Sequence, residues 1–271
     1  MTVRGSAAAK DMYLREVPED EAEGVVADVY ADIRDVLGLP LVNLFYRCLA
    51  VEPARLASIW QALRPNLISR RADDLSRRLV EVAAGPGHVT AAGFSSVGAD
   101  DELIAGARAT LDAYARGNSH NLLAMYALRN GCRGTGVGSE PADRAAALAV
   151  PPMVSLDALA PETLRFLRKT STRLVGEEEP VLVPSLLRHL AMSPLLFASL
   201  WSAVEPVLDS SLDTGREAVG EEASVLARQL PYAVTRLQDE SERNLATRFA
   251  RAMSTLLFVG ETFRAAPPEG S

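Results

Sequence analysis

The chain has 271 residues, a formal net charge of −7, 48% hydrophobic residues and 23% charged residues. The chain is acidic and has no dense Lys/Arg cluster of the kind that duplex nucleic acid binding requires, so we expect no nucleic acid partner. No apolar run approaches the roughly 20 residues that span a bilayer, and the N-terminal stretch lacks the apolar core of a signal peptide. We therefore expect a cytoplasmic protein without a membrane segment, large enough for one large domain or two ordinary ones.

Helical periodicity recurs along the chain, and no convincing alternating strand pattern accompanies it. The apolar residues at 56, 59, 60 and 63 fall on one helix face. Residues 101–128 predict a long helix, with a break expected at Gly117. Pro161 predicts the start of another helix, and residues 241–263 predict the last one. The sequence therefore predicts an all-α fold.

One helical segment of the chain occurs twice. Residues 38–67 return, altered, at 178–208 with an offset of 141 positions. The agreement over this window is well above chance, and it includes charged, aromatic and Pro positions as well as apolar ones. Identical pairs include Leu41 and Leu182, Arg47 and Arg188, Pro53 and Pro194, Trp60 and Trp201, and Pro65 and Pro206.

The repeated motifs divide the chain into two halves. Residues 114–123 match 249–258 more weakly, at an offset of 135, so the order of the motifs is kept. We predict a first helical repeat over 1–129, a linker rich in Gly and Pro over 130–160, and a second repeat over 161–271. The prediction is a duplicated helical bundle with a pseudo-twofold internal repeat, the two repeats packed as one domain. A small-molecule pocket is expected at the seam, and a fully filled seam is the alternative.

Three motifs resemble the DehI-type 2-haloacid dehalogenases: "LPLVNLFYRCLAVEP", "ARGNSHNLL" and "VPSLLRHLAMSP". The same order of motifs and the same duplication cover roughly residues 21–263. The resemblance implies an all-helical fold of two pseudo-symmetric repeats, commonly assembled as a homodimer, with the active site between the repeats. It also implies an Asp that activates a water to displace halide from the α-carbon, an Asn that positions this water, and apolar side chains that hold the substrate. No metal or cofactor is implied.

Matching the motifs residue by residue gives the expected site. The water-positioning Asn of the family corresponds to Asn118, and the Ser of the second-repeat motif corresponds to Ser185. The position of the catalytic Asp is occupied by Leu186, which cannot accept a proton. Asn43 and Leu44 take positions that are usually small and aromatic in the family. General base catalysis typically contributes about 10² to 10⁴ in rate, so the resemblance does not by itself carry the family's chemistry to this chain.

Neutral polar groups are expected around Asn118. Tyr114 and Asn121 lie on the same face of the predicted helix, at spacings of four and three residues. His189 follows Ser185 by four residues, so the two can form a hydroxyl–base pair. Amides and hydroxyls bind a carboxylate or stabilise an oxyanion, but they abstract protons poorly. The expected catalytic residues are Asn118 and Ser185, and the expected pocket residues are Leu41, Asn43, Leu44, Tyr114, Asn121, Leu186 and His189.

The sequence leaves three functions open. The first is a cofactor-independent enzyme for a small organic acid or carbonyl compound, with chemistry diverged from 2-haloacid hydrolysis; one acidic side chain of 177–179 is a candidate replacement base. The second is a non-catalytic binding protein that retains the pocket. The third is a structural protein with a closed seam. The three histidines and two cysteines show no metal-ligand spacing, so neither a metal nor a cofactor is expected.

Overall fold

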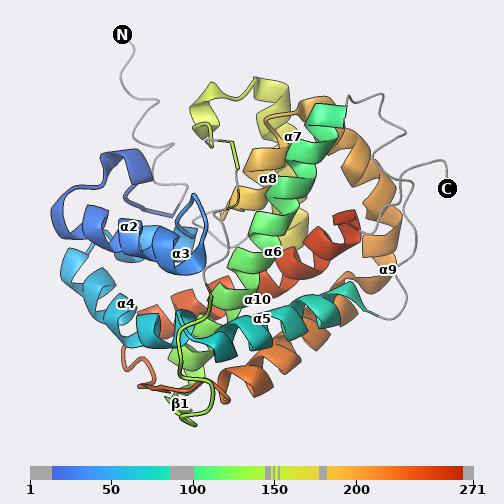
Figure 1. Cartoon of the computed structure of the whole chain (residues 1–271). Coiled ribbons are helices and arrows are strands. Elements are labelled where there is room, and N and C mark those ends of the chain that lie inside the picture. Colours follow the sequence, from blue (N-terminus) through green and yellow to red (C-terminus); the bar gives the residue numbers. More distant parts are fainter. Residues whose placement is uncertain are drawn as a thin grey trace.

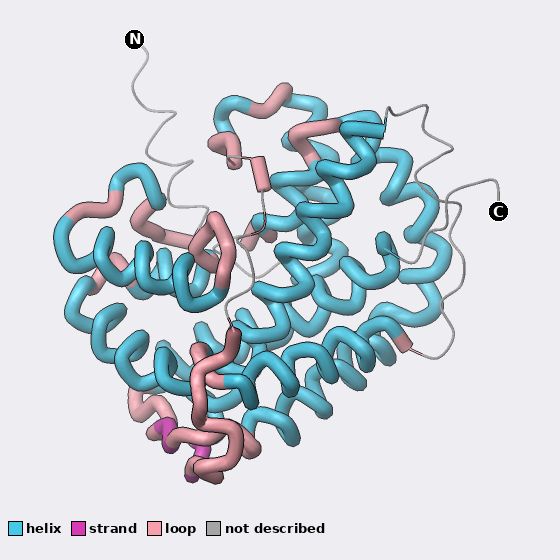
Figure 2. The backbone as a smooth tube through the Cα atoms, in the orientation of Figure 1, coloured by secondary structure: helices cyan, strands magenta, loops and turns pink. Residues whose placement is uncertain are grey.

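The computed structural model describes residues 14–85, 101–143, 148, 150–151, 153–176 and 182–264, so the acidic run at 177–179 lies outside the described residues. Helices make up nearly all of the regular structure in these ranges (Figures 1 and 2). Two long helices, α6 (Asp101–Asn130) and α10 (Glu240–Arg264), pack against each other in the middle of the molecule (Figure 1). The all-α prediction is confirmed.

The remaining helices surround this central pair. The first half contributes η1 (Glu19–Glu21), α2 (Gly24–Leu37), α3 (Leu44–Leu49), α4 (Pro53–Leu67) and α5 (Arg70–Ala84). The second half contributes η3 (Leu156–Ala158), α7 (Pro161–Val175), α8 (Ser185–Leu190) and α9 (Pro194–Ala227). Both α5 and α9 contact the central pair, and α8 contacts α6 (Figure 1).

The two halves use their helices in the same order. A short helix, α3 or α8, precedes a helix that begins with Pro53 or Pro194, where the missing N–H of Pro costs no hydrogen bond. In the first half the chain then breaks at Ser69, whose hydroxyl accepts from the backbone N–H of Ala72 at 3.2 Å and caps α5. In the second half α9 continues through the equivalent position, so it spans the length of α4 and α5 together. This parallel order supports the proposed division into two repeats.

The apolar core forms two clusters that meet along α6. Leu122 and Leu123 belong to the cluster around the helices of the first half, which also includes the C-terminal part of α9 and much of α10. Leu111 and Tyr114 belong to the cluster around α7, α8 and the start of α9 in the second half. A helix with apolar residues around its circumference is expected in such a buried position. The repeat-related Trp60 and Trp201 are only 3% and 4% exposed, as expected for core residues.

The structure corrects one prediction about α6. The helix runs without a break through Gly117, because nothing there interrupts its backbone hydrogen bonding. A Cβ at this position would lie 2.8 Å from Cδ1 of Leu39. Gly117 therefore admits a close contact with the segment before α3, rather than ending a helix.

A second difference lies at the start of the predicted linker. Two strands of two residues each, β1 (Cys132–Arg133) and β2 (Ala233–Val234), pair in antiparallel orientation and are the magenta segments in Figure 2. Gly134 follows with φ of +76°, and a Cβ there would lie 2.8 Å from the backbone N of Ala233. Strands of this length are too short to leave an alternating pattern in the sequence. None of the helices in the described ranges combines the length and hydropathy of a membrane span.

Candidate functional site

A recess is lined by α6, by the segment before α3 and by the start of α8. Its cavity volume is about 20 Å³, which is room for about one ordered water, so a larger ligand requires the lining side chains to move. The recess brings Asn118 of α6 together with Ser185 of α8, as the sequence predicts. Its lining consists of Leu39, Leu41, Asn43, Ala113, Tyr114, Gly117, Asn118, Asn121 and Ser185.

Two side-chain amides in this recess are buried and unpaired. Asn118 is 4% exposed and Asn121 is 2% exposed. The Nδ2 atom of Asn118 and the Oδ1 atom of Asn121 have no hydrogen-bond partner among the described residues. Leaving such a group buried and unpaired costs about 1–3 kcal/mol. Asn118 therefore offers a donor and Asn121 an acceptor to whatever fills the recess.

Asn66 shows how this chain treats a buried Asn with a structural role. Its side chain is 0% exposed. Its Nδ2 donates to the carbonyl oxygen of Tyr232 at 3.1 Å, and its Oδ1 accepts from the backbone N–H of Tyr232 at 2.8 Å. Both ends of that amide are satisfied, so the contrast with Asn118 and Asn121 is internal to the molecule.

Tyr114 and His189 form a hydrogen-bonded pair beside the recess. The Tyr114 hydroxyl lies 2.7 Å from Nδ1 of His189, and both side chains are buried. Nε2 of His189 lies 2.9 Å from the carbonyl oxygen of Pro151. A carbonyl only accepts, so Nε2 carries the ring proton and Nδ1 accepts from the Tyr114 hydroxyl. Burial lowers the pKa of His189 and raises that of Tyr114, so both groups are neutral in the resting state.

Asn43 and Ser185 lie at the N-termini of α3 and α8, and their side chains have different partners. Asn43 is the N-cap of α3, and its Oδ1 accepts from the backbone N–H of Phe45 at 3.0 Å. Burial raises the pKa of Tyr114, and the nearby side chain of Ser185, the first residue of α8, opposes this rise. The predicted hydroxyl–base pair is replaced by a contact of the Ser185 carbonyl oxygen, 3.3 Å from Nδ1 of His189.

Three of the expected pocket residues lie outside the lining. Leu186 is 1% exposed and packs in the apolar cluster of the second half, where its Cδ2 would lie 3.8 Å from a Cβ at Gly260. Leu44 is half-buried and packs against the cluster of the first half. His189 reaches the recess only through Tyr114. No carboxylate or imidazole is present among the described residues that line the recess.

Two arginines related by the repeat lie beside this region, and one of them is paired with a carboxylate. Arg47 is 4% exposed, and its Nε lies 2.9 Å from Oε2 of Glu16. Arg188 donates from Nη2 to the carbonyl oxygen of Val154 at 2.8 Å. Burial, and then the charge of Arg47, lower the pKa of Arg188. Both positive charges also lower the pKa of Tyr114, so they act at the edge of the recess.

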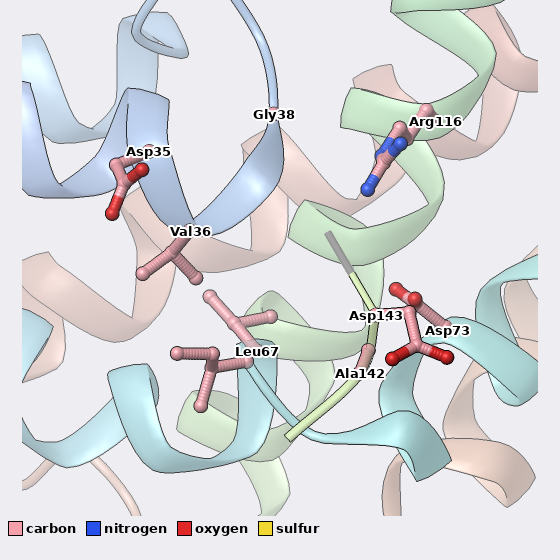
Figure 3. A pocket seen from close by; sticks show the side chains of 9 residues that line it. Asp35, Val36, Gly38, Leu67, Asp73, Arg116, Ala142 and Asp143 are labelled. Carbon is pink, nitrogen blue, oxygen red and sulfur yellow. The ribbon is translucent and has the colours of Figure 1, made fainter. Parts of the chain in front are cut away.

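A second recess lies on the other side of the Gly38–Leu39 segment (Figure 3). The guanidinium of Arg116 extends from α6 above Asp73 and Asp143, while Asp35 lies across from it on α2 (Figure 3). His120 lies behind Asp73, with Nε2 2.8 Å from the Asp73 carboxylate and Nδ1 2.9 Å from the carbonyl oxygen of Arg116. The His120 ring thus bridges two acceptors, the Asp73 carboxylate and the Arg116 carbonyl oxygen.

The described part of the chain holds no group of three or more His, Cys, Asp or Glu side chains arranged around a metal-sized space. The ionisable groups in or beside the first recess are the Tyr114–His189 pair, Arg47 and Arg188. Sequence reasoning singled out Tyr114 and His189 separately. It missed their pairing because they lie 75 residues apart.

No family model matches the sequence. A configuration-inverting 2-haloacid dehalogenase of Pseudomonas sp. (strain 113) is 29% identical over 126 residues, which is 45% of this chain and 41% of that protein. An (R)-2-haloacid dehalogenase of Pseudomonas putida is 43% identical over 49 residues, which is 18% of this chain and 16% of that protein. The matched regions thus span less than half of each curated relative.

Solved structures match over a much larger share of the chain. A D-2-haloacid dehalogenase mutant in complex with D-2-CPA has a TM-score of 0.76 at 20% identity, covering 94% of this chain and 96% of that chain. A D-2-haloacid dehalogenase in complex with L-LA has the same TM-score at 19% identity and the same coverage. The resemblance to the DehI-type 2-haloacid dehalogenases that the sequence motifs predict is confirmed, and the chain has the all-α fold of D-2-haloacid dehalogenases.

Proposed function

We propose that the protein binds a small organic acid or carbonyl compound in the recess between the two proposed repeats. It acts on this compound without a cofactor, by a chemistry that has diverged from the hydrolysis of 2-haloacids. The observation that carries the proposal is the pair of unpaired amides, Asn118 and Asn121, that line one recess. Buried amides are usually hydrogen-bonded, so two unmade hydrogen bonds in one recess favour a polar occupant there.

The choice of an acid or carbonyl compound follows from charge and donors. The Nδ2–H of Asn118 donates, and the charges of Arg47 and Arg188 favour a negative ligand. A carboxylate or a polarised carbonyl oxygen fits this environment. The relatives named above are dehalogenases of 2-haloacids, which agrees with a small acid as the ligand class.

Divergence of the chemistry follows from the missing carboxylate. Leu186 occupies the aligned position of the catalytic Asp and packs in the apolar cluster instead of lining the recess. Activation of water by direct proton transfer to a carboxylate therefore has no acceptor among the described lining residues. The same observation favours one alternative, a non-catalytic binding protein that retains the recess.

Binding and turnover are separated by a panel of small acids. Isothermal titration with propionate, lactate, pyruvate and 2-chloropropionate is expected to give binding that Asn118→Leu abolishes. Asn130→Ala, at the exposed end of the same helix, serves as the matched control and is expected to bind normally. Halide release from 2-chloropropionate is expected to be absent. Sustained halide release that Asn118→Leu removes would contradict the divergence, and equal binding by Asn118→Leu would contradict the site.

A homodimer and a cytoplasmic location are part of the same proposal, because the resemblance implies the first and the sequence composition favours the second. Multi-angle light scattering of the full chain measures the mass in solution. A mass of one chain at all accessible concentrations would contradict the dimer without affecting the assignment of the recess.

A further inference from the structure

We infer that Tyr114 and His189 together are the proton acceptor of this recess, and that they remove a proton from the carbon next to the carbonyl of a bound small 2-oxo acid. The inference rests on the proposed function, which places such a compound beside Asn118. It goes beyond that function by naming the groups that move the proton and the class of reaction, a proton transfer at carbon in place of a displacement of halide.

The orientation of the hydrogen bonds is the first step. The Pro151 carbonyl fixes the ring proton of His189 on Nε2, so Nδ1 holds a free lone pair and accepts from the Tyr114 hydroxyl. The hydroxyl proton of Tyr114 therefore points toward His189 and away from the recess. The Tyr114 oxygen can therefore accept a proton from a ligand while it passes its own to His189.

The position of Tyr114 is the second step. Tyr114 lines the recess on the same face of α6 as Asn118, one turn away. Ser185 lines the same recess from α8. The phenol oxygen thus lies at the boundary between the ligand space and the buried imidazole.

The proton transfer balances without a co-reactant. The C–H bond next to the carbonyl breaks, its proton passes to Oη of Tyr114, and the phenol proton passes to Nδ1 of His189. The electron pair of the C–H bond forms the carbon–carbon double bond of an enolate. The enolate oxygen accepts from Nδ2–H of Asn118, which has no other partner. Return of a proton by the reverse route restores the compound or its tautomer.

The environment of His189 accommodates both of its protonation states. The imidazolium would donate from Nε2 to the Pro151 carbonyl, while its new Nδ1–H faces the Tyr114 oxygen and the Ser185 carbonyl oxygen. Burial lowers the pKa of His189, followed in the same direction by the charges of Arg188 and Arg47, so the ring is neutral and ready to accept at pH 7. The negative charge of a bound 2-oxo acid opposes that effect of the two arginines.

Hydrogen–deuterium exchange tests the transfer directly. The methyl protons of pyruvate are followed by ¹H NMR in D₂O with the full-length protein. We expect protein-dependent exchange that Tyr114→Phe and His189→Gln reduce by about 10² to 10⁴. The matched control is Tyr126→Phe, which removes the hydroxyl of another, half-buried tyrosine on α6 that faces Gly220 of α9. Exchange with this variant is expected to proceed at the wild-type rate.

The pH profile separates proton transfer from a structural role of His189. The exchange rate is expected to rise with pH as His189 loses its proton, and to reach its plateau before pH 6.5, since the pKa of His189 is lowered from that value. His189→Gln is expected to lose this rise. A residue that merely supports Tyr114 by packing would lower the rate without changing the profile.

The ¹⁵N NMR spectrum of His189 needs no ligand and tests the geometry by itself. In the neutral ring, Nε2 is expected to carry the proton and Nδ1 to show the chemical shift of a hydrogen-bond acceptor, which Tyr114→Phe moves toward that of a free imidazole nitrogen. A neutral ring protonated on Nδ1, or an Nδ1 shift that Tyr114→Phe leaves unchanged, overturns the inference. Pyruvate that binds through Asn118 but exchanges no faster than with Tyr114→Phe also overturns it, and leaves the proposed binding function standing. Failure of every small acid to bind would overturn both.

Discussion

Replacing Asn118 by Leu is expected to stabilise the folded protein. The amide is 4% exposed, and its Nδ2 has no partner among the described residues, so the native state carries the cost of one buried unpaired group. That cost is about 1–3 kcal/mol. Leu has a similar size, and it is a better helix former than Asn in the middle of α6. We therefore expect the free energy of unfolding to rise by about 1–3 kcal/mol while ligand binding is lost.

The opposite result is expected for Asn66. Asn66→Leu removes two hydrogen bonds to the backbone of Tyr232 and leaves that N–H and carbonyl without their protein partner. Each of the two bonds contributes about 0.5–1.5 kcal/mol. We expect the free energy of unfolding to fall by about 1–3 kcal/mol. The same substitution, at two buried Asn residues of one chain, thus has opposite signs.

Urea denaturation of wild type, Asn118→Leu and Asn66→Leu measures both effects, with thermal midpoints as a second measure. For a chain of this size, each kcal/mol shifts the midpoint by roughly 2–4 °C. A binding site that keeps polar groups unpaired at a cost to folding shows this pattern of stability traded against function. Should Asn118→Leu lose as much stability as Asn66→Leu, Asn118 is a structural residue and the reasoning behind the recess is wrong.

Two further predictions concern residues near the recesses. In Gly117→Ala the new Cβ would lie 2.8 Å from Cδ1 of Leu39, so the Leu39 side chain must turn into the recess. Titration calorimetry should then show an affinity for small acids that is about tenfold weaker, with little change in the free energy of unfolding. Burial raises the pKa of Asp73, but the hydrogen bond and charge of His120 outweigh it and the net pKa is lowered. The stability that Asp73 contributes is therefore present above its unfolded pKa near 3.9 and is lost as pH falls through the lower folded value. Urea denaturation of wild type and Asp73→Asn should give curves whose difference shrinks below about pH 4, and a difference that stays constant down to pH 2 would show that the pair contributes nothing.

The helices were predictable because their signals are local. Pro161 begins α7, and a periodic apolar face accompanies the long helices, so the all-α class follows from residues close in sequence. Gly117 misled the prediction for the opposite reason. Its function in the fold is the contact with Leu39, 78 positions away, and a glycine required by such a distant contact looks the same in the sequence as a glycine that ends a helix.

The site was predictable to the extent that motifs carry it. Asn118 and Ser185 came from motif matching, and the structure brings both to one recess. The same alignment placed Leu186 in the pocket, but side-chain direction on a one-and-a-half-turn helix is not contained in an alignment. On α8 the successive residues Ser185 and Leu186 point in different directions, one to the recess and the other to the apolar cluster. The pairing of Tyr114 with His189 depends on how α6 and α8 pack, which no local pattern reports.

The energetics of the recess support the proposal that it binds an occupant. Two unpaired buried amides cost about 2–6 kcal/mol together, which is a large share of the 5–15 kcal/mol by which proteins of ordinary stability stay folded. A seam filled with apolar side chains would avoid this cost, and the neighbouring Leu39, Leu41 and Ala113 show that the chain places such side chains there. A ligand that accepts from Asn118 and donates to Asn121 removes the cost on binding. The free energy that folding loses at these two amides is thereby available for binding, and this links the stability of the empty protein to its affinity for the occupant.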